Sequence, residues 1–165
     1  MRRARTVGGH PPAGVVVHVQ YGVPRRGVPA PASFRRWVFA ALGRRRRAEV
    51  TVRVVGRAEG TDLNERYRGK AVPTNVLAFP FEAPAGLRGA WLGDLVICAP
   101  LVAEEAAAQG KGLSDHWAHL VIHGILHLLG YDHQGEAEAA EMENLEVTLL
   151  RRLGVADPYG DTDAT

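Results

Sequence analysis

An apolar segment in the last third of the chain carries three of its seven histidines at a spacing that few structures can satisfy. In "HGILHLLGYDH", residues 123–133, His123 and His127 are four positions apart, so on a helix both imidazoles lie on one face, about 6 Å apart along the axis. Gly130 follows where a helix can end in a left-handed residue, and the chain can then fold back so that His133 approaches from the side. Three imidazoles on one ion would leave a coordination position open, as in catalytic zinc sites.

The spacing H-x-x-x-H-x-x-G-x-x-H is the ligand skeleton of the metzincin proteases except at one position. Those proteases carry a glutamate as general base after the first histidine, and this chain has Gly124 there. The pattern therefore predicts the metal ligands without the protease's base. His116 and His119 continue the same helix face upstream, where they could support the ligands or contact the substrate, but we expect them to be solvated helix residues. Asp132, next to a ligand, is expected to be a turn residue or a partner of a ligand rather than the base.

The remaining chain predicts strands in its first part and helices in its last part. Strands are expected at residues 14–22, 48–56, 74–81 and 91–100, and helices at residues 31–45, 61–69, 101–110, 115–130 and 136–154. The third and fourth strands are separated by a turn-rich segment, which predicts a hairpin. Thr61 or Asp62, and Ser114, are the expected N-caps of two of the helices. This order predicts the α+β class, with helices packed on one small sheet.

The length of 165 residues fits a single domain. The polar or Gly/Pro-rich ends predict a disordered extension at residues 1–14, a folded domain at 15–153 and a disordered tail at 154–165. We find no secretory signal and no apolar run of roughly 18 residues that could span a bilayer, and the single Cys98 is expected in the core. These features predict a cytoplasmic protein without a membrane partner.

Charge is distributed unevenly along the chain. Residues 1–70 carry 16 Lys and Arg against 4 acidic side chains, whereas residues 71–165 carry 4 against 14. The run Arg44, Arg45, Arg46 and Arg47 would attract a phosphate backbone, and arginine adds bidentate geometry. A solvated arginine-rich surface explains the same run, so the charge is compatible with RNA as a partner but does not by itself indicate RNA binding.

Three stretches together, "HGILHLLGYDH", "LNERYRGKAVPTNVLAFPF" and "LGDLVIC", resemble the YbeY family of bacterial metal-dependent endoribonucleases, also called rRNA maturation factors. The match spans roughly residues 48–150. The resemblance implies a mixed sheet of about four strands surrounded by helices, and one Zn²⁺ per chain held on a helix and the following turn by His123, His127 and His133. It also implies cleavage of single-stranded RNA in maturation of the 16S rRNA 3′ end and in ribosome quality control, with the rRNA precursor and the ribosome or its associated proteins as partners.

The resemblance also assigns residues beyond the metal ligands. The family's functional arginine, in its "YRGK" stretch, corresponds to Arg68, which we expect to act in catalysis together with His123 and to contact the substrate. The run at residues 44–47 would then hold the RNA backbone. Asn75 and Asp94 lie in matching stretches, where a turn or strand-end hydrogen bond explains them as well as a site role does.

The residues leave two alternatives open. One is a metalloprotease-like hydrolase, suggested by the ligand skeleton, against which Gly124 weighs. The other is a ribosome- or RNA-binding module whose metal is structural, against which the open coordination position weighs.

Overall fold

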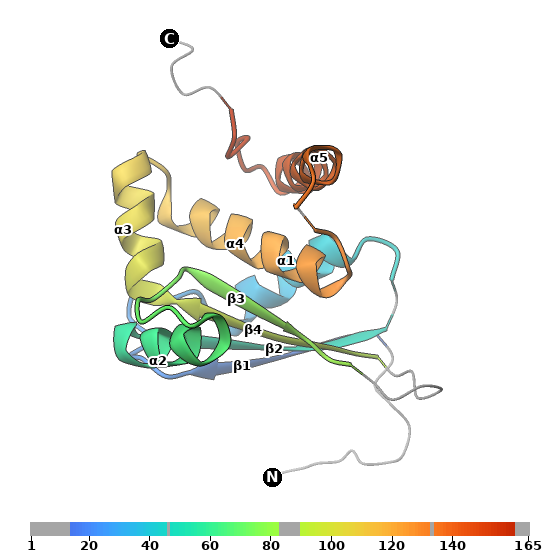
Figure 1. Cartoon of the computed structure of the whole chain (residues 1–165). Coiled ribbons are helices and arrows are strands. Elements are labelled where there is room, and N and C mark those ends of the chain that lie inside the picture. The colour runs from blue at the N-terminus through green and yellow to red at the C-terminus, as the bar shows by residue number, and fades with distance from the viewer. Residues whose placement is uncertain (1–13, 46, 83–89, 133, 161–165) are drawn as a thin grey trace.

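Four strands form one sheet, in the order β1-β2-β4-β3, in the computed structural model, which describes residues 14–45, 47–82, 90–132 and 134–160 (Figure 1). The strands are β1 (Val15–Tyr21), β2 (Ala48–Val55), β3 (Val76–Pro80) and β4 (Trp91–Cys98). β1, β2 and β4 run parallel to one another, and β3 pairs antiparallel with β4 at the edge. The small mixed sheet of the α+β prediction is therefore confirmed, as is the hairpin of its last two strands.

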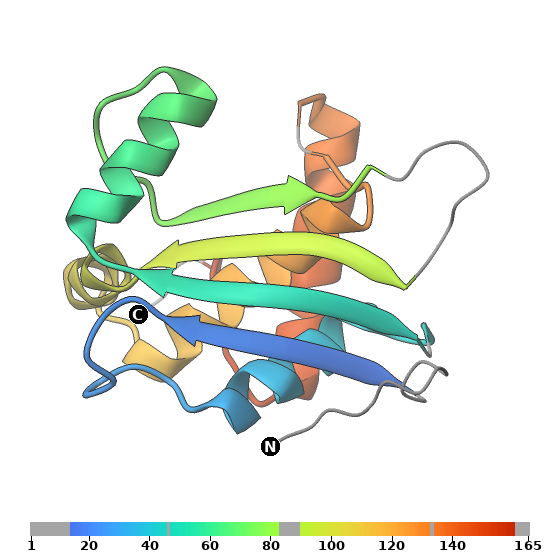
Figure 2. The same ribbon diagram turned by 90° about the horizontal axis from the view of Figure 1, so that it is seen from below.

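The alternating pattern of β2 separates the two faces of the sheet. Val50, Val52 and Val54 are fully buried, whereas Thr51 and Arg53 point to the other face. The face that carries the valines is covered by α1 (Pro31–Leu42) and α4 (Leu113–Leu128), and the opposite face is seen in the view from below (Figure 2).

Aromatic rings fill the layer between α1, α4 and the sheet. Phe34 meets both Trp37 and Trp117 edge-on, with ring centroids 5.7 Å apart in each pair. Edge-to-face pairs of this kind add to the burial of the rings themselves. The pair of Phe34 and Trp117 joins α1 to α4, which carries the histidine motif.

The other helices complete the surroundings of α4. α5 (Glu136–Arg152) packs on the outer side of α4, so that α4 lies between the sheet and α5 (Figure 1). α3 (Ala99–Gln109) contacts one end of α4. α2 (Arg57–Arg68) packs beside a second apolar cluster that contains Cys98, which is buried as predicted. No helix in the described ranges is long and apolar enough to cross a membrane.

Two helices begin before the residues that the sequence favours as caps. The N-cap of α2 is Gly56, about one and a half turns ahead of Thr61 and Asp62, and the N-cap of α4 is Gly112 rather than Ser114. Neither N-cap contributes a side-chain hydrogen bond. In each helix the carbonyl of the N-cap glycine accepts the first helical hydrogen bond at 3.0 Å, from Gly60 in α2 and from His116 in α4, so the backbone continues past the favoured caps, whose side chains are worth only about 1 kcal/mol.

Candidate functional site

α4 ends in the reversal that the sequence predicts. Gly130 adopts a positive φ of 104°, its N–H donates to the carbonyl of His127, and the N–H of Tyr131 donates to the carbonyl of Leu126, both at 3.0 Å. This pair of bonds is the Schellman motif, and a glycine at its centre avoids the strain that a Cβ would bring. The third predicted ligand, His133, follows this turn but lies outside the described residues.

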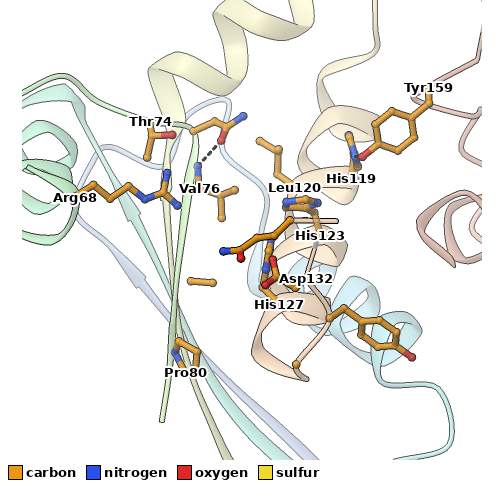
Figure 3. Close-up of a pocket in the computed structure, with 16 residues that line it drawn as sticks. Arg68, Thr74, Val76, Pro80, His119, Leu120, His123, His127, Asp132 and Tyr159 are labelled. Carbon is orange, nitrogen blue, oxygen red and sulfur yellow. Dashed lines mark hydrogen bonds between the residues drawn. The ribbon is translucent and has the colours of Figure 1, made fainter. Parts of the chain in front are cut away.

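His123 and His127 lie one turn apart on the same side of α4, as predicted. Their ring centroids are 4.7 Å apart and the rings are nearly perpendicular, at 77°. Both side chains face a cavity of about 680 Å³ (Figure 3). One wall of the cavity is α4 and the turn that follows it; the other is β3 with the end of α2. Asp132, in the turn, also lines the cavity.

Arg68 reaches the same cavity from the opposite wall. It is the last residue of α2, which ends because Gly69 adopts a left-handed φ of 72° and its N–H caps the carbonyl of Glu65. The Arg68 side chain extends over β3 toward the histidines (Figure 3). The fold thus brings together the guanidinium and the two imidazoles that the sequence singled out.

Gly124, where a metzincin carries its glutamate, packs directly against a side chain of the sheet. A Cβ at this position would lie 2.7 Å from Cδ2 and 3.1 Å from Cδ1 of the fully buried Leu95 on β4. Carbon atoms in contact are normally about 3.5–4.0 Å apart. A glutamate here would have to displace the core, so the missing base follows from how tightly the helix sits on the sheet.

A buried carboxylate supports the histidines from behind. Glu146 on α5 is fully buried, and its Oε2 lies 2.6 Å from Nδ1 of His123. Its Oε1 lies 2.9 Å from Nε2 of His119 and accepts a hydrogen bond from the hydroxyl of Tyr159 at 2.6 Å. Burial alone would raise the pKa of this carboxyl, but the hydrogen bonds from His119 and His123 outweigh it and lower the pKa to about 2. The carboxylate is therefore ionised at neutral pH and accepts from three donors.

The donor atoms at this place suit a divalent metal ion. Imidazole nitrogens bind Zn²⁺ and several other transition-metal ions well, and His123 and His127 offer two such rings side by side. Since Nδ1 of His123 faces Glu146, Nε2 is the nitrogen through which His123 would share an ion with His127. A second group, formed by His119, His123 and Glu146, also could hold a metal ion, because its ligand atoms lie within 4.8 Å of one another.

His116 and His119 are not the solvated helix residues that we expected. His116 is only 4% exposed, and its Nε2 lies 2.8 Å from Oε1 of Glu105 on α3. His119 is bound to Glu146 as described above. The expectation is wrong because α3 and α5 enclose α4 and supply a carboxylate to each of these rings.

Asn75 joins the cavity, whereas Asp94 does not. Asn75 lines the cavity, donates to Oε1 of Glu105 at 3.1 Å and accepts the N–H of Val76 at 2.7 Å. Asp94 alternates along β4 with the core residue Leu95 and pairs with Phe79 across the ladder, so it lies on the far face of the sheet. Burial raises the pKa of Asp94 above its ordinary value.

The predicted RNA-contacting arginines occupy a different part of the surface. Arg44 and Arg45 line a second hollow together with the exposed Phe39 at the end of α1, and Arg47 is exposed just before β2. Arg46 lies outside the described residues. A role of this run in RNA binding stays a prediction.

Two residues of the site were missed in the sequence. Glu146 follows Met142 by four positions and precedes Leu150 by four, which places it on the buried face of α5. A carboxylate among these apolar residues could have indicated a buried polar contact. Tyr159 lies in the segment expected as a tail, yet residues 154–160 return to α4, and its ring packs edge-on against His119 (Figure 3). No pattern in the sequence near Tyr159 predicts its contact with His119.

Comparison with known proteins decides the family. The family model described as Endoribonuclease YbeY matches residues 32–154. This chain belongs to the YbeY family. A YbeY relative from Nitrosococcus oceani is 56% identical over 148 residues, which cover 88% of this chain and 97% of the relative. One from Alkalilimnicola ehrlichii is 59% identical over 149 residues, 87% of this chain and 90% of the relative. Both are named Endoribonuclease YbeY.

A solved structure shares the fold of this chain without close sequence similarity. The solution structure of a Thermotoga maritima protein superposes with a TM-score of 0.54 at 22% identity, covering 89% of this chain and 99% of that one. The resemblance predicted from the three sequence stretches is confirmed.

Proposed function

We propose that this chain is a zinc-dependent endoribonuclease that cuts single-stranded RNA, acting in the cytoplasm in maturation of the 16S rRNA 3′ end and in ribosome quality control. The relatives that share more than half of its aligned residues are named endoribonucleases. The observation that carries the proposal is that His123, His127 and Arg68 line the same cavity, the two histidines on one wall and Arg68 on the other. An rRNA precursor would be the substrate, with the ribosome or its associated proteins as partners.

His123 and His127 would hold one Zn²⁺, with His133 as the proposed third ligand. The ion, when bound, would supply Lewis acidity toward a phosphoryl oxygen. Arg68 would present paired N–H donors to the same phosphate from across the cavity and stabilise the negative charge that develops as the phosphorus is attacked. Both walls therefore act on one phosphodiester.

The recessed shape of the cavity supports a preference for single strands. A phosphate must enter between α4 and β3 to meet both Arg68 and the histidines. A flexible strand can splay its backbone into such a recess, whereas a continuous A-form duplex presents a stiff, wide surface. Gly124 weighs against the protease alternative, since its contact with Leu95 leaves no room for a carboxylate base at that position.

The test compares metal content and cleavage of a single-stranded RNA oligonucleotide for the wild type, His123→Ala and Arg68→Ala. His123→Ala should lose both metal and cleavage. Arg68→Ala should keep its metal and lose about 100-fold or more in kcat, as when one donor to a transition-state oxyanion is removed. Two surface variants serve as matched controls: Arg66→Ala, on the same helix with a side chain 73% exposed, and His18→Ala, with a side chain 48% exposed. Full cleavage by a metal-free His123→Ala/Arg68→Ala protein would refute the proposal.

The ends of the cleaved RNA would identify the attacking group. A 2′,3′-cyclic phosphate indicates attack by the neighbouring 2′-hydroxyl, and a 5′-phosphate with a 3′-hydroxyl indicates attack by water. The same oligonucleotide annealed to its complement should be cut much more slowly if the recess selects single strands.

A further inference from the structure

Glu146 is the one carboxylate that is buried among the described residues, and the proposed reaction does not use it. It lies on α5, behind the histidines of α4, and does not line the cavity. A buried ion pair seldom stabilises a fold more than apolar residues of the same volume would. Its presence calls for another explanation.

The hydrogen bonds of Glu146 determine the orientation of His123. Oε2 of Glu146 lies 2.6 Å from Nδ1 of His123, which is a hydrogen-bond distance. Nε2 lies on the other side of the ring and is therefore directed away from Glu146. A carboxylate behind a metal-bound histidine acts in this way in many zinc sites.

The carboxylate is itself held from two further directions. His119, one turn before His123 on α4, and Tyr159, from the segment after α5, both meet Oε1. His119 and Tyr159 also contact each other, at 3.1 Å between Nε2 and the hydroxyl oxygen. Two segments, α4 and the chain after α5, therefore hold the carboxylate of α5 beside the imidazole of His123.

We infer that Glu146 is the positioning residue of the metal centre: it sets the tautomer and ring orientation of His123, and His119 and Tyr159 hold it in place. This role rests on the proposed metal site at His123 and His127. Glu146 raises the affinity for the ion without touching it.

The distances argue against Glu146 as a direct ligand. Two ligand atoms each about 2.0–2.1 Å from one tetrahedral zinc ion are about 3.3 Å apart. Oε2 of Glu146 and Nδ1 of His123 are only 2.6 Å apart, which is a hydrogen-bond distance. The group of His119, His123 and Glu146 would have to open before it could hold an ion.

The test measures metal affinity by competition with a coloured chelator, for Zn²⁺ and for Co²⁺. Glu146→Gln, which keeps the shape of the side chain and removes its charge, should weaken binding tenfold to a hundredfold. Tyr159→Phe, which removes one donor to Glu146, should weaken it severalfold. Glu105→Gln is the matched control, because Glu105 contacts His116, which is not a proposed ligand. The metal affinity of the Glu105→Gln protein should stay within about twofold of that of the wild type.

The absorption spectrum of bound Co²⁺ separates positioning from ligation. At saturation, the Glu146→Gln protein should show the same band positions and intensities as the wild type, because the ligands are unchanged. Altered bands in Glu146→Gln, or loss of binding in His119→Ala to the same degree as in His123→Ala, would show direct ligation and overturn the inference. Wild-type affinity in Glu146→Gln would overturn it as well, and if that variant fails to fold, wild-type affinity in Tyr159→Phe decides against it. Failure of the wild type to bind metal or cut RNA would instead refute the proposed function.

Discussion

Replacing Gly124 by alanine tests whether close packing of α4 on β4 excludes a side chain at that position. The added Cβ would lie 2.7 Å from Cδ2 of Leu95, roughly 1 Å inside normal contact, and Leu95 is fully buried. Overpacking of this kind destabilises the fold by about 1–3 kcal/mol, and the higher helix propensity of alanine offsets about 1 kcal/mol of that loss. Gly124→Ala should therefore destabilise the metal-free protein by about 1 kcal/mol, lowering Tm by about 2–4 °C.

A second substitution should reverse the sign of this effect. Leu95→Ala alone costs about 2–5 kcal/mol but removes both methyl groups that the new Cβ meets. In that background Gly124→Ala should stabilise by about 1 kcal/mol, giving a coupling of about 2 kcal/mol between the two positions. Gly60→Ala in α2 is the control: its Cβ would meet no atom closer than 3.5 Å, so it should stabilise by up to about 1 kcal/mol.

Urea denaturation of the four proteins of this cycle, with a chelator present, measures the coupling directly. If Gly124→Ala changes the free energy of unfolding equally with and without Leu95, the contact between these residues does not determine what position 124 can hold. The structural account of the missing glutamate would then be wrong.

Three further predictions concern the metal and its surroundings. Zn²⁺ at 100 times its dissociation constant should stabilise the chain by about 2.7 kcal/mol and raise Tm by roughly 5–10 °C, and a scan with and without chelator that shows no difference would exclude a specific site. In metal-free protein, the pKa of about 2 for Glu146 lies below its ordinary 4.5, so its ionised form stabilises the fold above pH 4.5 and this contribution fades as the pH falls toward 2. The difference in unfolding free energy between wild type and Glu146→Gln should therefore shrink by about 3 kcal/mol from pH 5 to pH 2, and a constant difference in urea titrations would contradict it. Zinc-loaded protein should leave casein intact, since residue 124 supplies no carboxylate, and cleavage that a chelator blocks would argue for the protease alternative.

Patterns that depend only on neighbours along the chain were predictable from the sequence. The alternation of Val50, Val52 and Val54 located β2 and its buried face. The spacing of His123 and His127 together with Gly130 gave a helix, one shared face and a reversal, all of which the structure contains. Such features follow from the periodicity of helices and strands, which is visible in the order of apolar and polar residues within each segment.

Features that depend on contacts between distant segments were not predictable in the same way. Thr61 and Ser114 are good capping residues, but their helices begin earlier, after Gly56 and Gly112. Nothing in the local sequence shows that His116 is buried and His119 half-buried, because each lies beside a carboxylate that a distant helix, α3 or α5, supplies. Arg68 was located by resemblance to a family, because nothing in its local sequence distinguishes it from a surface arginine at a helix end.

The contact of Tyr159 with Glu146 determines how short this chain can be made. A fragment that ends at residue 153, the boundary that composition suggests, keeps Arg68 and every proposed ligand but loses one of the three donors to the buried carboxylate. Such a fragment should bind a metal ion less tightly than the whole chain, because the hydroxyl of Tyr159 no longer helps to hold the carboxylate that contacts His123.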